Sequence, residues 1–161
     1  MKKQLLIFAF FIFQLSFGQQ NTTTYYFIRH AEKVDNSQDP DLSEKGLERT
    51  KLWSEIFSEI NFDQIYATDY KRTIQTASVT ATSKKIEIKL YNPKTIIKED
   101  FLKETLGKTV LIVGHSNTTP SFFNQIINQK VYTDIEDKTF GNLYIVTIVK
   151  DVITYQLLKL P

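Results

Sequence analysis

The chain has 161 residues, a length typical of one compact domain that buries its own core without disulfides or a structural metal. Its net charge of +2 includes Lys2 and Lys3, and the remainder carries 18 basic and 18 acidic residues. A neutral chain without a stripe of Lys and Arg is not expected to bind nucleic acid or an anionic membrane surface. The absence of cysteine excludes disulfides and thiolate chemistry.

The N-terminal residues have the pattern of a secretory signal peptide. Two lysines precede the apolar run 5–13, and the small residues Ser16 and Gly18 stand at the positions that a signal peptidase recognises. We therefore expect a signal peptide over residues 1–18 and a single exported domain, periplasmic or secreted, over residues 19–161. A retained membrane anchor is the alternative, but a spanning helix needs about 20 apolar residues, and this run is shorter.

The first half of the domain predicts two strand and helix pairs. An aromatic and β-branched run at 24–28 predicts a buried strand, and 65–67 predicts a second one. Ser43 and Asp69 are each placed to cap a helix that follows, the second of which extends to about residue 83. The apolar face predicted for the Ser43 helix consists of Leu47, Trp53, Ile56, Phe57 and Ile60.

The second half continues this alternation and ends in a hairpin. We predict a third strand at 86–90, a helix at 96–106 that Gly107 closes, and a strand covered on both faces at 110–113. Pro120 is expected to start a further helix. The last two runs, 143–149 and 152–158, flank a short turn and predict an antiparallel hairpin. The fold class is therefore α/β, a three-layer α/β/α arrangement with a mostly parallel sheet and an antiparallel C-terminal edge.

The rarest polar residues stand at the ends of the predicted strands. Arg29 and His30 follow the first strand, Arg72 follows the second, and His115 follows the fourth. Ligands of open α/β sheets bind at the carboxyl ends of the strands, and arginine matches phosphate oxygens bidentately. These four residues therefore predict a site for one phosphate-sized anion. The third arginine, Arg49, lies inside a predicted helix and is interpreted as a solvated surface charge.

Four segments resemble the motifs of the histidine phosphatase superfamily. They are 27–32 (FIRHAE), 41–46 (DLSEKG), 66–77 (YATDYKRTIQTA) and 113–117 (VGHSN). The resemblance implies a phosphoglycerate mutase-like fold and a phosphatase that hydrolyses a small phosphomonoester or phosphoramidate. It implies no cofactor and no metal.

The resemblance also implies roles for particular residues. His30 would attack phosphorus to form a phosphohistidine, which water would then hydrolyse. Arg29, Arg72 and His115 would surround the phosphoryl oxygens and stabilise their charge in the transition state. Asn36 and Asn117 would be additional phosphate contacts.

The sequence departs from the family pattern at two places. Ala31 stands where the commoner motif has glycine, and alanine adopts a left-handed backbone less easily. Many relatives carry Glu or Asp directly after the third strand as the proton donor, whereas this chain has Tyr91-Asn92-Pro93. Glu32 and Asp69 are the nearby candidates for that proton donor, and the more distant ones are Glu99 and Asp100. A substrate with a good leaving group would need such a donor less.

Three alternatives remain open at this stage. A phosphate-binding module with weak catalysis is consistent with the missing acid. A metallohydrolase could use His30, Glu32 and His115, although Arg29 and Arg72 would repel a cation. A serine hydrolase could use 114–118, but Thr118 replaces the final glycine of the nucleophile elbow. The oligomeric state is not predicted.

Overall fold

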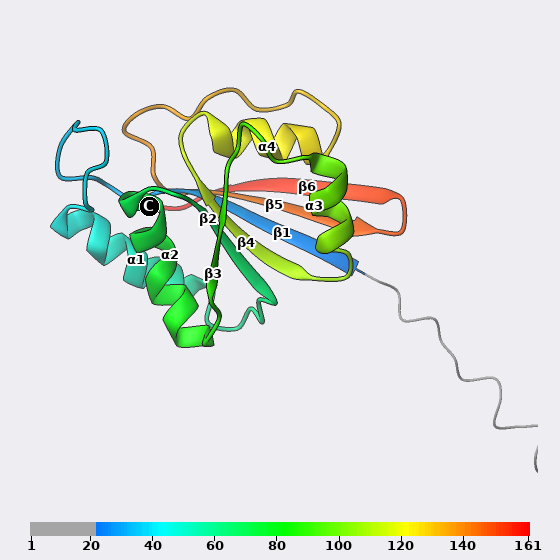
Figure 1. Cartoon of the computed structure of the whole chain (residues 1–161), viewed down its shortest axis with the longest axis horizontal. Helices are drawn as coiled ribbons and strands as arrows, with labels where there is room; N and C mark the ends of the chain where they lie inside the picture. The colour runs from blue at the N-terminus through cyan, green and yellow to red at the C-terminus, as the bar shows by residue number, and fades with distance from the viewer. Residues whose placement is uncertain (1–21) are drawn as a thin grey trace, which may run out of the picture.

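The computed structural model describes residues 22–161. The predicted signal peptide, 1–18, lies outside the described residues. Within the described residues, no helix combines the length and the hydropathy that crossing a bilayer requires. Six strands and four helices alternate along the described chain and end in two consecutive strands (Figure 1).

The strands form one mixed sheet in the order β3-β2-β4-β1-β5-β6. Four of them are parallel, and each ends at the same rim of the sheet. These are β1 (Thr22–Arg29), β2 (Gln64–Thr68), β3 (Ile88–Tyr91) and β4 (Thr109–Gly114). The other two, β5 (Asn142–Val149) and β6 (Val152–Lys159), form the antiparallel hairpin at one edge. The predicted α/β class, the largely parallel sheet and the edge hairpin are therefore confirmed.

The helices cover both faces of the sheet (Figure 1). On one face lie α1 (Glu44–Ile56) and α2 (Lys71–Lys84), which pack against each other. On the other lie α3 (Lys98–Glu104) and α4 (Thr118–Ile126). Ser43 is the N-cap of α1, as predicted, because its side chain accepts a hydrogen bond from the backbone N–H of Gly46.

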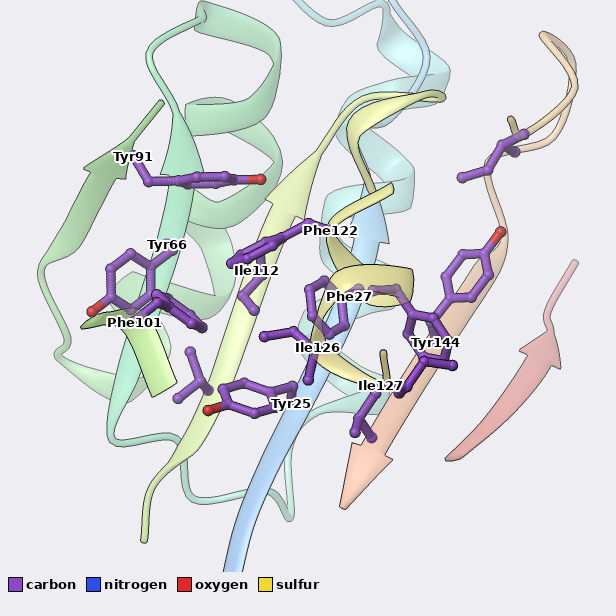
Figure 2. Packing of buried hydrophobic residues seen from close by; sticks show 14 residues of the cluster. Tyr25, Phe27, Tyr66, Tyr91, Phe101, Ile112, Phe122, Ile126, Ile127 and Tyr144 are labelled. Carbon is purple, nitrogen blue, oxygen red and sulfur yellow. The ribbon is translucent and has the colours of Figure 1, made fainter. Parts of the chain in front are cut away.

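Each face of the sheet has its own apolar core. Under α1 and α2 the core contains Trp53 and Phe57, whose rings stack at 5.5 Å. Under α3 and α4 the core is mostly aromatic, and Figure 2 shows its rings spread along one face of the sheet. Edge-to-face contacts such as that of Phe27 with Phe122 hold the central strand β1 against α4. The two cores fix the strand ends that carry the polar residues.

Three local predictions are wrong, each for a physical reason. Asp69 does not cap α2, because Tyr70 occupies the N-cap position and Asp39, from a distant loop, accepts the N–H of Lys71 at 2.9 Å. The last helix begins before Pro120, because Asn117 caps it and a proline is tolerated within the first turn.

In α1, Leu47 is 49% exposed, so it does not belong to the buried face. Gly46, Thr50 and Trp53 form that face instead.

Candidate active site

A polar cavity of about 590 Å³ lies at the rim where the four parallel strands end. The last residues of β2 and β3 and the residues that follow β1 and β4 all line it. Its charged lining residues are Arg29, Lys33, Arg72 and Lys94 together with Asp69 and Asp137. The cavity is therefore net positive, although the domain as a whole is not.

His30 is held in the cavity wall as a neutral imidazole with one defined tautomer. Its side chain is 4% exposed, and Nδ1 lies 2.8 Å from the carbonyl oxygen of Ala31. A carbonyl oxygen only accepts hydrogen bonds, so Nδ1 must carry the proton and Nε2 has a free lone pair. Burial, reinforced by the nearby charges of Arg29 and Arg72, lowers the pKa of His30 to about 4 despite the bond to Ala31. Nε2 therefore has a free lone pair at neutral pH.

His115 lies beside His30, with the two ring centres 5.4 Å apart and the ring planes at 62°. Its Nε2 is 2.9 Å from Oγ1 of Thr68, the last residue of β2. Burial and then the charge of Arg72 lower the pKa of His115 to about 3. The predicted convergence of the two histidines on one rim is what the structure shows.

Arg72 reaches the same cavity from the first turn of α2. Its Nη2 is 3.4 Å from Nδ1 of His115, and its guanidinium lies 4.5 Å above the ring of Tyr70. Nη1 is 3.6 Å from the carboxylate of Asp39, which orients the side chain without burying it. Tyr70, whose ring also packs at 5.0 Å against His115, was not among the predicted site residues. Aromatic residues in helix-start turns are too common to mark such a contact in advance.

Arg29 makes more contacts within the protein than its predicted role in binding phosphate oxygens requires. Nη1 donates hydrogen bonds to three carbonyl oxygens of the loop before β5, those of Glu136, Asp137 and Thr139. The guanidinium lies 4.4 Å from the ring centre of Phe140, and the side chain is 4% exposed. Arg29 thus anchors this loop beside the cavity and also contributes positive charge to its wall.

Glu32 does not lie with the histidines. Arg49 binds its two carboxylate oxygens through Nε at 2.8 Å and Nη2 at 2.9 Å, and Lys45 is 3.5 Å away. Burial raises the pKa of Glu32, but the hydrogen bonds from Arg49 outweigh burial and bring the pKa below its ordinary value. The carboxylate is therefore ionised and bound, which is unsuited to proton donation. The three ligands of the metallohydrolase alternative are consequently not brought together.

Arg49 is correspondingly not a solvated surface charge. Its side chain and that of Glu32 are each only 12% exposed, and the pair joins the loop after β1 to α1. Gly46 permits this close approach, because a Cβ at that position would lie 2.1 Å from the carbonyl oxygen of Glu32. The sequence separation of Glu32 and Arg49 gives no pattern from which the ion pair could be predicted.

The remaining predicted residues divide into two groups. Asn117 lines the cavity and caps α4, whereas Asn36 is exposed on the loop before α1 and does not line it. Asp69 lines the cavity as an exposed residue. Ala31 needs no left-handed backbone, since the non-glycine residues with positive φ in the described chain are Lys85, Asn128 and Lys150.

Tyr91 also lines the cavity, although it was not among the predicted site residues. It ends β3 and lines the cavity, yet its side chain is 8% exposed and its hydroxyl has no hydrogen-bond partner in the described structure. Figure 2 shows the ring lying across the sheet with the hydroxyl directed toward β4. Burial raises the pKa of Tyr91, so the hydroxyl remains protonated.

A larger hollow of about 760 Å³ lies along α4 and the loop that follows it. It is lined by amide and hydroxyl side chains with Lys130 and Asp134, and it contains neither histidine nor arginine. Among residues 22–161, no group of three or more His, Cys, Asp or Glu is arranged to hold a metal ion. The cavity at the strand ends is therefore where the two histidines and the arginines lie together, and it is the candidate active site.

The protein is therefore of the α/β class, with two histidines and two arginines in one cavity at the carboxyl ends of its parallel strands. Residues 25–92 match the family model of the histidine phosphatase superfamily (branch 1). This segment is therefore similar to that superfamily, and the fold as a whole is that of phosphoglycerate mutase-like proteins.

The similar proteins resemble this chain either in part of its sequence or in most of its fold. Phosphoserine phosphatase 1 of Hydrogenobacter thermophilus is 37% identical over 84 residues, which are 48% of this chain and 36% of the relative. The chain thus spans about a third of that protein.

The alpha-ribazole phosphatase of Shigella flexneri superposes with a TM-score of 0.68 at 12% identity, covering 84% of this chain and 96% of the other. The phosphoglycerate mutase of Bacillus anthracis has a TM-score of 0.67 at 15% identity, with 87% and 94% covered.

Proposed function

We propose that the protein is a phosphatase that hydrolyses a phosphomonoester or phosphoramidate through a covalent phosphohistidine on His30. The observation that carries this proposal is the state of His30, which is neutral and presents Nε2 to a cavity lined by Arg29 and Arg72. A neutral imidazole can attack phosphorus, and the arginines can stabilise the charge on the phosphoryl oxygens. The covalent step divides one displacement into two easier ones.

The proposed reaction needs no metal, because the arginines supply the positive charge. His30 would attack the phosphorus atom, the leaving oxygen would depart, and water would then cleave the phosphohistidine. Removing one preorganised charge-stabilising donor typically costs about 100- to 1,000-fold in rate. Arg72→Ala is therefore expected to lower kcat by a factor in that range.

The substrate is proposed to be a small phosphorylated molecule. The relatives named above include a phosphoserine phosphatase, an alpha-ribazole phosphatase and a phosphoglycerate mutase, so a shared phosphoryl group with varied remainders supports this class. A cavity of about 590 Å³ has the size of a small-molecule site.

The direct test is to trap the phosphoenzyme. Brief incubation with a labelled aryl phosphate, followed by denaturation, should leave an acid-labile and base-stable label on the wild type and none on His30→Ala. Lys51→Ala, an exposed change on α1, serves as the matched control and should label normally. Vanadate binding without turnover would instead support the phosphate-binding module, and full activity of His30→Ala would exclude the mechanism.

We also propose that the protein is exported. The support is the short cationic and apolar leader with small residues at 16 and 18. Expression with the native leader should give a product whose N-terminus, measured by mass spectrometry, begins at Gln19 and which is found outside the cytoplasm. A product that keeps Met1 in the cytoplasm would refute export while leaving the phosphatase proposal intact.

A further inference from the structure

Hydrogen bonds through Thr68 and Thr73 fix the position of the proton on His115. Oγ1 of Thr73 donates to the carbonyl oxygens of Thr68 and Tyr70, both at 2.8 Å. Oγ1 of Thr68 donates to Oγ1 of Thr73 at 3.0 Å. Since the only hydrogen of Thr68 Oγ1 is used in that bond, this oxygen must accept from His115 Nε2. The carbonyl oxygens can only accept, and Arg72, which can only donate, faces the other ring nitrogen of His115, so both ends of this chain of hydrogen bonds give the same direction.

The other ring nitrogen of His115 therefore has a lone pair. Nδ1 lies 3.4 Å from Nη2 of Arg72, which can only donate. Nε2 of His30 also has a lone pair, because its Nδ1–H donates to Ala31. Each of the two neighbouring imidazoles thus has one lone pair; that of His115 faces Arg72 across a long contact, which a bound phosphoryl group would replace by taking both as partners.

A fully ionised phosphate would place oxygen lone pairs against Nδ1 of His115. Two acceptors repel, and protonation of His115 is disfavoured by its burial and by Arg72. A singly protonated phosphate removes this conflict, because its P–OH can donate to Nδ1 while its other oxygens face the arginines. The required hydrogen then arrives with the substrate.

We propose that the site is selective for the monoanion of the phosphorylated substrate, whose proton binds at Nδ1 of His115 and leaves on the departing oxygen. This inference rests on the proposed phosphatase function. The bond from His30 Nε2 to phosphorus forms, and the bond from phosphorus to the leaving oxygen breaks. The proton that the phosphoryl oxygen carries, positioned by its hydrogen bond to Nδ1 of His115, ends on that leaving oxygen, and His115 stays neutral. The total charge is unchanged, and no further proton source is needed.

This arrangement supplies the proton of the leaving oxygen without using a carboxylic acid, although Asp69 and Asp137 also line the cavity. Glu32 is bound to Arg49, and β3 ends at Tyr91 and is followed by Asn92 rather than by an acid. His115 acts on the substrate directly. Thr68 and Thr73 are positioning residues, because they act only by fixing which nitrogen of His115 has the lone pair.

Several charged groups besides the substrate face His115. They are Arg72 on α2, Arg29 and His30 at the end of β1, and Asp39 on the loop before α1. Two cavity carboxylates, Asp69 and Asp137, lie on the rim. An experiment must therefore distinguish ionisation of the substrate from ionisation of any of these groups.

Two aryl esters with different phosphate acidity make that distinction. The second pKa of a phosphomonoester is about 6, and the nitro group of 4-nitrophenyl phosphate places its second pKa below that of phenyl phosphate. The alkaline limb of kcat/KM should fall tenfold per pH unit and should begin at lower pH for the nitrophenyl ester. A limb at the same pH for both esters, or a flat profile to pH 8, would overturn monoanion selection while leaving phosphatase activity established.

Variants of Thr68 test the fixed tautomer. Thr68→Val removes the acceptor of Nε2–H and should lower kcat/KM by about 10- to 100-fold, since an imidazole in the wrong tautomer is catalytically poor. Thr68→Ser should restore most of the loss. Thr80→Val is the matched control, because Thr80 is equally buried and its hydroxyl has no partner in the described structure. Equal activity of Thr68→Val and Thr80→Val would contradict the role given to Thr68.

Discussion

The two neutral histidines should make the folded protein unusually sensitive to mild acid. Burial lowers the pKa of His30 to about 4 and that of His115 to about 3, whereas an unfolded chain has the ordinary value near 6.5. Between these values the unfolded chain binds protons that the folded chain does not. Stability is therefore unaffected above about pH 6.5 and falls as the pH is lowered toward 4.

The size of the effect follows from the linkage of proton binding to folding. One pKa unit corresponds to about 1.36 kcal/mol, so each histidine should cost about 2 kcal/mol between pH 6.5 and pH 5. Together they should remove about 4 kcal/mol. Such a loss is a large part of the 5–15 kcal/mol typical of a domain.

Urea unfolding at pH 7.5 and pH 5 measures this loss, with the slope of the transition checked at both. The carboxylates of the protein also titrate, so the comparison is made with the double variant His30→Asn and His115→Asn, which cannot take up these protons. The difference between the two pH values should be smaller in the double variant by about 4 kcal/mol. Equal pH dependence in both proteins would refute the buried neutral state of the histidines.

Other contacts lead to further predictions. Glu32→Gln should keep aryl phosphatase turnover within about threefold, because a carboxylate bound to Arg49 donates no proton; a loss above about 100-fold would assign Glu32 to the chemistry. Arg49→Met leaves that buried carboxylate unpaired and should lower the free energy of unfolding by ~3 kcal/mol in urea. Gly46→Ala should destabilise by ~2 kcal/mol, because the methyl group meets the Glu32 carbonyl at 2.1 Å, whereas glycine to alanine in an open helix stabilises by about 1 kcal/mol. Tyr91→Phe removes a buried hydroxyl without a partner and should leave the melting temperature equal or higher; a clear decrease would reveal a partner for that hydroxyl.

The sequence predicted the strands and the meeting of Arg29, His30, Arg72 and His115 because both depend on local patterns. A buried parallel strand is a continuous apolar run, and the residue after it must lie at the carboxyl rim. These local patterns do not indicate which side chains pair with one another across that rim.

Pairs between distant segments were accordingly not predictable. Arg49 and Glu32 form an ion pair although one is in a helix and the other in a loop, and Asp39 replaces Asp69 in satisfying the start of α2. The hydrogen bond between Thr68 and His115 was equally unpredictable. The sequence around a threonine at the end of a strand does not indicate whether its side chain packs or forms a hydrogen bond. In each case the partner is set by the tertiary fold rather than by spacing along the chain.

The position of β1 within the sheet has a consequence for motion. This strand is paired on both sides, with β4 and β5, whereas β3 is a four-residue strand at the sheet edge. Amide hydrogens around the proposed nucleophile should therefore exchange with solvent among the slowest, and those near Tyr91 and Asn92 among the faster ones. The rim near β3 can then be remodelled by substitution or insertion while the nucleophile stays fixed. A fold whose local stability falls from β1 to β3 can therefore change the side chains that contact the leaving group while His30 keeps its position.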